Sequence, residues 1–393
     1  MQLKSLLIEG WRGIHLSIAL VNQYQLLELS RYADIRLKHS DLDFYADSWQ
    51  DKNNRVVFPD HLNSTIASIP PPDDDETFDF VYRIGFPFDR PQHQAPRRAT
   101  FMVCESALSS THLGSADRGP EYFCAQDDFI VTPSNWSKLK LLDFGFAETR
   151  IKVIPHGVSE EIFYPASLDE RQAIRSDLEI ASPEFVFLNV GTGIFNKGLD
   201  ILIAAFDLVR QRNDHARLML KDAPDLYGMS LLDFFQKFEG LNGTLSEQTR
   251  NSIYMMPSKL RFSDMRLLYS ASDCYVSPYR AEGFNLPVME ALACGLPVIV
   301  TDGGATDDFC RAGVARKVTA KQVMNCERPE FFRGEILPGY HLEPSIESLA
   351  EQMQIAIDTN LSSTAEFRRE RTLLLKEFSW REASRKLHEA FFS

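Results

Sequence analysis

Short apolar runs alternate with segments of helical periodicity along most of the 393-residue chain. Runs that are apolar on successive residues are typical of strands buried on both faces, as in parallel sheets. Their alternation with helices predicts right-handed βαβ units. In the first part of the chain the pattern predicts strands at 4–9, 79–86, 99–105, 128–134 and 150–157, and helices at 17–32 and 135–146.

The alternation starts afresh near Glu184, after a loop-like stretch with prolines and a glycine between Pro155 and Ala181. This second series predicts strands at 184–191, 216–222, 251–257, 273–278 and 296–302, and helices at 198–212, 230–238, 263–272 and 286–294. Three more helices are predicted at 345–360, 364–378 and 380–392. Two such series predict an α/β protein with two doubly wound, Rossmann-like domains that face a cleft.

Composition narrows the class of protein. The formal charge of −13 makes the chain a poor general binder of nucleic acid or of anionic membrane. No stretch approaches the roughly 18 apolar residues of a membrane span, and the N-terminus lacks the apolar run of a signal peptide. The six cysteines are widely spread and the nine histidines lack metal-ligand spacing. We therefore expect a cytoplasmic protein without a bound metal or cofactor.

The stretch from Ala281 to Gly304 reads as a loop, a short helix, a strand and a glycine loop. Pro287 fits the first helical turn, and Gly295 fits the C-terminal cap. Ligands of open α/β sheets bind outside the carboxyl ends of the strands, and this is where the helix begins. Unpaired amides of a first helical turn bind phosphate well. We expect those amides to be near Asn285, Leu286 and Val288.

Two carboxylates flank this predicted anion site: Glu282 just before it and Glu290 within about one helical turn after it. Carboxylates accept hydrogen bonds from hydroxyls and do not bind phosphates. A nucleotide sugar carries a diphosphate between two hydroxyl-bearing rings, so it would use all three features. We expect Glu290 to hold the ribose and Glu282 the transferred sugar. The alternative is that both glutamates are solvated surface charges.

At these residues the chain resembles a known family. The sequence EGFNLPVMEALACGLPVI resembles the E-x7-E signature of retaining glycosyltransferases of family 4, which have the GT-B fold. Three further stretches are similar to that family: NVGTGIFNKGLDILIAAF to its donor-phosphate loop, RIKVIPHGVSEEIFYP to its interdomain segment, and FSWREASRKLHEAF to its C-terminal helix. The resemblance implies an acceptor-binding domain over 1–165, a donor-binding domain over 166–376, and a final helix, 377–393, that packs back on the first domain.

The resemblance also implies roles for single residues. Lys197 would contact the donor phosphates and stabilise the leaving diphosphate, although a surface lysine in a turn is the alternative. Thr192 and Gly193 belong to the same donor loop, and Thr192 stands where the family often has an arginine. The nucleotide base would pair with backbone near Leu260, in the stretch from Lys259 to Arg261.

Three further residues each have a functional and a structural interpretation. Gly13 resembles the family's N-terminal glycine loop, which approaches donor phosphate or acceptor, but a plain βα turn fits equally. Glu105 follows an apolar run, where its carboxylate would orient an acceptor hydroxyl or cap a turn. Gly304 would approach the sugar or simply form a tight turn.

The resulting prediction is a retaining, metal-independent glycosyltransferase. It would move a sugar from a nucleotide-sugar donor, with UDP or GDP as the nucleotide, to a carbohydrate or lipid-linked acceptor. Peripheral membrane contact is possible through arginines in the first domain, whereas nucleic acid is not expected. Two alternatives stay open: another enzyme on this fold, such as a nucleotide-sugar epimerase or sugar phosphorylase, and a donor-binding subunit without turnover.

Overall fold

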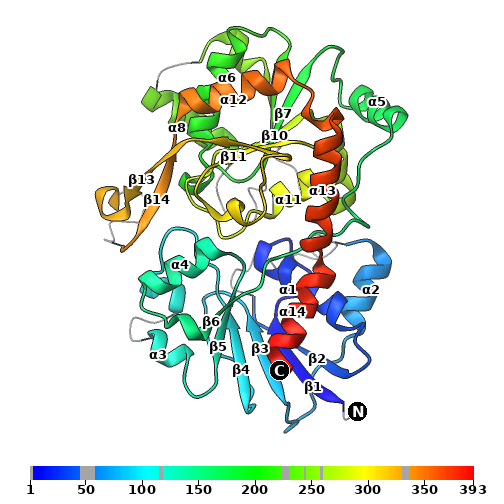
Figure 1. The fold of residues 1–393 in the computed structure, drawn as a ribbon, viewed down its shortest axis with the longest axis vertical. Coiled ribbons are helices and arrows are strands. Elements are labelled where there is room, and N and C mark those ends of the chain that lie inside the picture. The colour runs from blue at the N-terminus through cyan, green and yellow to red at the C-terminus, as the bar shows by residue number, and fades with distance from the viewer. Residues whose placement is uncertain are drawn as a thin grey trace. The chain divides into compact units, whose positions relative to one another are not determined.

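The computed structural model describes residues 3–44, 58–114, 118–222, 230–242, 245–256, 260–329 and 337–393. The chain divides into two compact units (Figure 1). Unit 1 comprises Met1–Gly157, Arg328–Gly339 and Phe378–Ser393, and unit 2 comprises Val158–Glu327 and Tyr340–Glu377.

Unit 1 is built on a six-stranded sheet in the order β2-β1-β3-β4-β5-β6. All of its strand pairs are parallel. The strands are β1 (Lys4–Gly10), β2 (Ile35–Asp41), β3 (Phe80–Ile84), β4 (Arg97–Phe101), β5 (Phe129–Thr132) and β6 (Ile151–Val153). The α-helices are α1 (Ser17–Leu29), α2 (Asp60–Ser68), α3 (Pro120–Phe123), α4 (Asn135–Asp143) and α14 (Trp380–Phe392).

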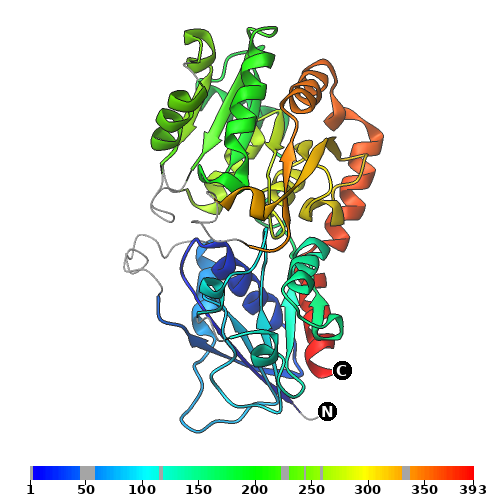
Figure 2. The same ribbon diagram turned by 90° about the vertical axis from the view of Figure 1, so that its left-hand side faces the viewer.

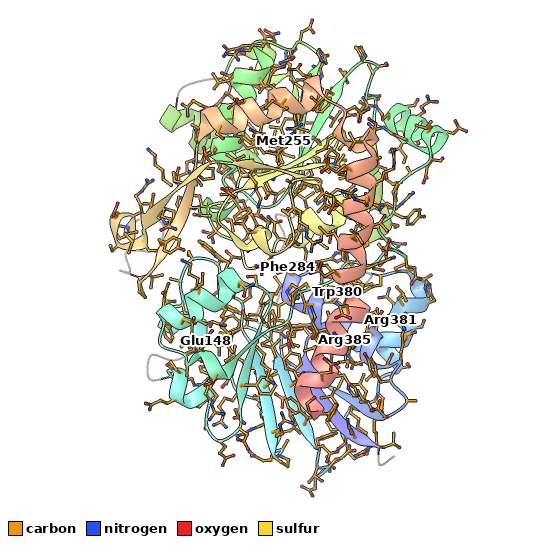
Figure 3. All side chains as sticks on the ribbon, in the orientation of Figure 1. Glu148, Met255, Phe284, Trp380, Arg381 and Arg385 are labelled. Atoms are coloured by element: carbon orange, nitrogen blue, oxygen red, sulfur yellow. The ribbon has the colours of Figure 1, made fainter. Side chains whose placement is uncertain are left out.

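The last helix, α14, packs on the first unit although it follows the whole of unit 2 in sequence (Figures 1 and 2). Its Phe391 is buried and stacks on Phe80 of β3 with ring centroids 4.3 Å apart. Trp380, labelled at the start of the helix in Figure 3, stacks on Tyr24 of α1 at 4.6 Å. These apolar contacts bury one face of the helix and provide most of the force that holds it there.

Unit 2 has a second six-stranded parallel sheet, in the order β12-β11-β10-β7-β8-β9. Its strands are β7 (Phe185–Val190), β8 (Ala216–Lys221), β9 (Ile253–Met256), β10 (Cys274–Ser277), β11 (Val298–Thr301) and β12 (Ala315–Val318). A separate antiparallel hairpin pairs β13 (Ala320–Met324) with β14 (Tyr340–Pro344).

The helices of unit 2 follow its strands. They are α5 (Leu168–Asp177), α6 (Leu199–Arg210), α8 (Leu231–Asn242), α9 (Glu247–Arg250), α10 (Phe262–Ala271), α11 (Leu286–Ala293), α12 (Ile346–Asp358) and α13 (Ala365–Glu377). The main core lies between the sheet and the helices α6 and α12, where Phe187, Phe206 and Met353 are almost fully buried. This rigid layer fixes the positions of the loops at the sheet edge.

The predicted strands and helices are present in the structure, with differences in their bounds. The predicted strand 99–105 is displaced, because β4 runs from Arg97 to Phe101 and the following residues form a loop. Sequence periodicity missed β2, β12, the β13–β14 hairpin and the helices α2 and α5.

The described ranges also bear on the predictions about membrane spans, metal binding and cysteines. None of the helices there combines the length and apolar character that a membrane span requires. Within the same ranges, no group of three or more His, Cys, Asp or Glu side chains is placed to hold a metal ion. All six cysteines are free thiols.

Candidate functional site

The strand order of unit 2 reverses between β7 and β10. From β7 the chain proceeds outward to β8 and β9, and it then returns to the other side of β7 to form β10. The connections that leave β7 and β10 therefore diverge, and such a switch point is where open α/β sheets bind ligands. The loops that follow these two strands, 191–198 and 278–285, contain half of the residues predicted for the donor site in unit 2: Thr192, Gly193, Lys197, Glu282 and Asn285.

The structure brings Lys197 and Glu282 together from those two loops. The Nζ of Lys197 donates to Oε1 of Glu282 at 2.5 Å. The side chain of Glu282 is only 6% exposed, whereas that of Lys197 is 24% exposed. The interpretation of Glu282 as a solvated surface charge is therefore wrong. A buried carboxylate is costly without a partner, so this ion pair stabilises the ligand-free loops.

The start of α11 has fewer unpaired backbone amides than the sequence predicted. Asn285 adopts the left-handed conformation (φ 79°, ψ 66°), and its side-chain amide donates to the hydroxyl of Ser277 at 2.9 Å. The prediction for Val288 is wrong, because its amide already donates to the carbonyl of Asn285 at 3.1 Å. Within the described residues the amides of Asn285 and Leu286 have no acceptor, so these two can bind an anion.

Glu290 lies one turn further along α11, and it is also not a solvated surface charge. The hydroxyl of Tyr269, on α10, donates to its Oε2 at 2.7 Å. The side chain is partly buried, and this burial raises the pKa of Glu290 to about 7, although the bond from Tyr269 opposes the rise. The group can therefore be proton donor or acceptor near neutral pH.

Arg280 joins the two loops, and the sequence analysis did not identify it. The residue is 3% exposed, and its guanidinium pairs with Asp200 of α6 and Glu343 of β14, with Nη2 at 2.6 and 2.9 Å from their carboxylate oxygens. It also lies over the ring of Phe195, 4.4 Å from the centroid. Its backbone amide donates to the carbonyl of Asn196 at 2.8 Å. These contacts hold the Lys197 loop against the Glu282 loop.

The guanidinium group of Arg280 is already paired with the carboxylates of Asp200 and Glu343. Arg280 therefore does not replace the arginine that the family often has at the position of Thr192. Its position in the sequence offered one signal. A single arginine stands between Tyr279 and Ala281, both fully buried, just before the signature. A buried arginine requires carboxylate partners, but their identity depends on the tertiary fold.

The glycines of the predicted donor site have packing reasons for their identity. A Cβ on Gly193 would lie 2.8 Å from the side chain of Phe234, and one on Gly304 would lie 2.5 Å from the hydroxyl of Tyr279. For Gly304 this supports the structural alternative. Thr192 is 4% exposed. Leu260 lies in the stretch before α10, and Lys259 lies outside the described residues.

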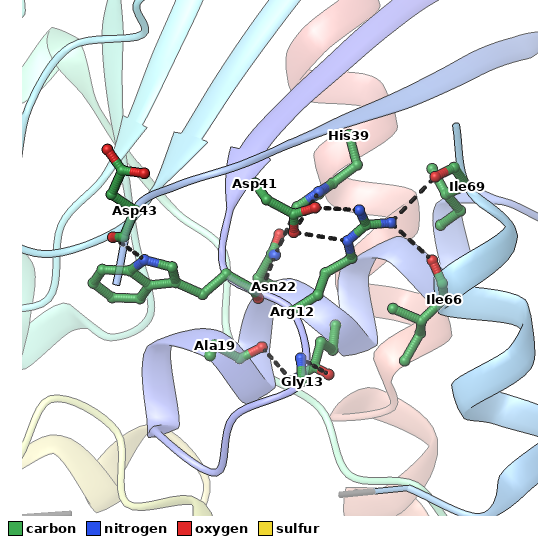
Figure 4. A network of polar contacts seen from close by, with 11 residues as sticks. Arg12, Gly13, Ala19, Asn22, His39, Asp41, Asp43, Ile66 and Ile69 are labelled. Atoms are coloured by element: carbon green, nitrogen blue, oxygen red, sulfur yellow. Dashed lines mark hydrogen bonds and ion pairs between the residues drawn. The ribbon is translucent and has the colours of Figure 1, made fainter. Parts of the chain in front are cut away.

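Glu105 and Gly13 belong to unit 1, so the structure does not join them to the Lys197–Glu282 pair. Glu105 lies in the loop after β4 rather than at a strand end, and its carbonyl accepts from the indole of Trp136. Gly13 has a left-handed φ of 76°, and its amide donates to Gln23 at 2.9 Å (Figure 4).

A cavity of about 1030 Å³ lies next to Gly13. Arg12 and Asp41 form an ion pair on its wall, and the guanidinium of Arg12 also donates to the carbonyls of Ile66 and Ile69 (Figure 4). Burial and the nearby charge of Arg12 lower the pKa of His39 to about 3, so this histidine is neutral. The arrangement is a polar pocket at the carboxyl ends of β1 and β2.

The two doubly wound parallel sheets define the class of fold, which is GT-B. Solved glycosyltransferase structures share it over nearly the whole chain. A glycosyltransferase from Rickettsia africae covers 99% of this chain and 98% of its own at a TM-score of 0.66 and 15% identity. HepE from Anabaena, in complex with UDP-glucose, covers 98% of each chain at a TM-score of 0.68 and 15% identity. The predicted fold class is confirmed.

Sequence comparison is more specific but covers less of the chain. Residues 170–325 match the family described as glycosyl transferases group 1. Mannosylfructose-phosphate synthase from Agrobacterium fabrum is 30% identical over 184 residues, 45% of this chain and 38% of the relative. D-inositol 3-phosphate glycosyltransferase from Salinispora tropica is 28% identical over 53% of this chain and 45% of its own. The chain thus spans less than half the length of these curated relatives. The family match, 170–325, lies within unit 2.

Proposed function

We propose that the protein is a retaining glycosyltransferase that resembles family 4 and uses a nucleoside diphosphate sugar. One observation carries the proposal. The Lys197–Glu282 pair lies at the switch point of unit 2, close in sequence to the two backbone amides at the start of α11 that donate to no group within the described residues. The match of residues 170–325 to glycosyl transferases group 1 supports it. HepE was solved in complex with UDP-glucose and with UDP, so UDP is the first nucleotide to test.

The ion pair suggests how a donor would engage the site. The diphosphate of the donor forms an ion pair with the ammonium group of Lys197 and accepts hydrogen bonds from the backbone amides of Asn285 and Leu286. Because Lys197 then serves the phosphate, the carboxylate of Glu282 is released to accept from hydroxyls of the transferred sugar. Glu290, whose pKa is about 7, accepts from ribose hydroxyls in its ionised form. Each charged side chain of the pair therefore neutralises the other until a donor binds and replaces this contact.

In the proposed reaction the bond from the anomeric carbon to the leaving phosphate oxygen breaks, and a bond from that carbon to the acceptor oxygen forms on the same face. The acceptor's proton goes to the departing phosphate. Lys197 and the helix-start amides stabilise the negative charge that grows on the diphosphate, which is the largest electrostatic demand of the step. No protein-bound metal or cofactor takes part.

The first test is donor binding. Thermal unfolding with UDP, GDP and ADP should show an increase for one nucleotide, about 2.7 kcal/mol of stabilisation at 100 times its Kd. Slow hydrolysis of the matching nucleotide sugar should accompany binding. Binding with no hydrolysis and no transfer would favour the alternative that the absence of an arginine at Thr192 suggests, a donor-binding subunit without turnover. No binding of any nucleotide would contradict both.

Lys197→Ala tests the assigned chemistry. The variant should lower the rate of donor hydrolysis or transfer about 100-fold, because one preorganised charge on the leaving group is lost. Glu290→Ala should mainly weaken nucleotide binding. Lys138→Ala is a matched control, since this lysine pairs with Glu148 in unit 1. Unchanged kinetics in both site variants would remove the site assignment.

The acceptor stays a prediction. One relative is a mannosylfructose-phosphate synthase and the other a D-inositol 3-phosphate glycosyltransferase, so fructose phosphates and inositol 3-phosphate should be screened beside carbohydrate and lipid-linked acceptors. The anomeric configuration of the product, read by NMR, tests retention. An inverted product would contradict the proposed mechanism even if transfer occurs.

A further inference from the structure

A second cavity, of about 810 Å³, lies in unit 2 at the amino ends of its strands. Its walls include Phe185 at the start of β7, Cys274 at the start of β10 and Val298 at the start of β11. Because the strands are parallel, these amino ends lie at the sheet edge opposite to the one that carries Lys197 and Glu282. The cavity is therefore distinct from the proposed donor site, and its volume suits a small molecule.

Three arginines in this cavity form no ion pair within the described ranges: Arg316, Arg368 and Arg371. Each donates instead to a neutral oxygen. The acceptors are the hydroxyl of Thr359 at 3.0 Å for Arg316, the carbonyl of Ser363 at 2.7 Å for Arg368, and the carbonyls of Leu292 (2.6 Å) and Ala293 for Arg371. Glu160 acts on Arg371 at longer range, but within the described ranges no carboxylate lies at ion-pair distance from the three guanidinium groups. In a chain with a formal charge of −13, three such groups around one cavity point to an anion.

The acidic groups of the cavity do not neutralise these arginines. Asp273 is occupied by Arg171 at 2.6 Å and by Arg175 at 3.1 Å. Asp358 also lines the cavity and accepts from the side-chain amide of Gln354 at 3.1 Å. The arginines thus outnumber the carboxylates, and the cavity carries a local excess of positive charge.

Uncharged residues form the rest of the wall. Ser270 is one of them, but its Oγ has almost no accessible surface and so does not face the cavity. Apolar side chains such as Leu296 and Phe367 complete the wall and would contact a carbon skeleton.

We propose that this cavity binds a small organic phosphate. The guanidinium groups of Arg316, Arg368 and Arg371 would receive the phosphate, and the apolar part of the wall would contact the carbon skeleton. The site does not depend on the proposed donor chemistry, since none of these residues belongs to the switch-point loops.

The test uses the full chain carrying Lys197→Ala, so that phosphate binding at the proposed donor site is weakened. Calorimetric titration with glucose 6-phosphate and with inorganic phosphate should show one site per chain, with the organic phosphate bound more tightly. Arg316→Gln should weaken binding about tenfold, because one charge-assisted contact is lost. Arg369→Gln is the matched control: this exposed arginine is on α13, pairs with Glu370 and does not line the cavity, and its loss should change affinity less than twofold.

Absence of binding, or equal effects of Arg316→Gln and Arg369→Gln, would overturn the proposal, as would tighter binding of inorganic phosphate. Arg316→Lys should bind between wild type and Arg316→Gln, because it keeps the charge but loses the fork of donors. In the wild-type background, Arg316→Gln should leave nucleotide affinity unchanged. A failure of nucleotide binding would therefore reject the proposed function without affecting this inference. A failure of phosphate binding in the cavity would reject this inference without affecting the proposed function.

Discussion

At the scale of single residues, the unusual group is Glu290, whose pKa burial raises to about 7 from an ordinary value of 4.5. Between these two pH values the folded protein holds a proton that the unfolded chain has released. The contribution of this group to stability is therefore full below pH 4.5 and is lost as the pH rises through 7. Above that pH the folded state contains a buried negative charge.

Glu290→Gln should remove this pH dependence. The amide still accepts from Tyr269, so at pH 8 the free energy of unfolding should rise by about 2 kcal/mol, with almost no change at pH 4. Urea unfolding at the two pH values measures the difference. The control is Glu351→Gln, an exposed glutamate on α12, which should show no such difference. A lower stability of Glu290→Gln at pH 8 would contradict the prediction.

The sequence predicted Glu282, Lys197 and the start of α11 as site residues, and the structure places Lys197 beside Glu282, but the sequence did not point to Arg280. Glutamates, a lysine and helix-start residues have local signals, because capping residues and glycines mark where they lie. Arg280 becomes meaningful only when α6 and β14 bring Asp200 and Glu343 to it. The hydrogen bond that engages the amide of Val288 depends on the left-handed turn at Asn285, which the sequence does not reveal.

At the scale of elements, the two loops of the candidate site meet at Gly198. This residue has a φ of 65°, and a Cβ there would lie 2.0 Å from the carbonyl oxygen of Pro278. Both the conformation and the close approach require glycine. The position of Lys197, its neighbour, therefore depends on backbone contact between the loops that follow β7 and β10.

Gly198→Ala should destabilise unit 2 by about 3 kcal/mol and weaken nucleotide binding, because the loops must separate to admit the methyl group. Gly119→Ala is the matched control. Gly119 has a φ of −123°, and a Cβ there meets no atom within 4 Å, so its effect should stay within about 0.5 kcal/mol. Chemical denaturation and nucleotide titration measure the two effects. Equal effects of the two substitutions would contradict this account.

Sequence periodicity predicted the buried strands well because they are apolar on successive residues. It missed β2, an edge strand with the sequence IRLKHSD, because four of its residues are only partly buried or exposed and carry polar side chains. It missed β13 for the same reason, since this strand of the small hairpin is largely exposed. Elements with little buried apolar surface leave little periodicity in a sequence.

At the scale of the whole molecule, unit 1 depends on the last helix of the chain. Phe391 is 1% exposed and contacts Phe80, Tyr82 and Phe129. Phe391→Ala should therefore cost about 3–5 kcal/mol. Phe392→Ala, which truncates the half-buried neighbour, should cost less. Hydrogen exchange should show the loss in peptides of β1, β3 and α1, and a loss confined to unit 2 would contradict the assignment of α14 to unit 1.

This dependence has a consequence for biosynthesis. The ribosome makes the six strands of unit 1 first, yet the aromatic rings of β3 and β5 receive Phe391 only after all of unit 2 has been translated. Domains that emerge early generally fold early, but this one must wait with an apolar surface uncovered. We therefore expect the nascent chain to need chaperone protection at unit 1, and unit 2 to reach its final form first.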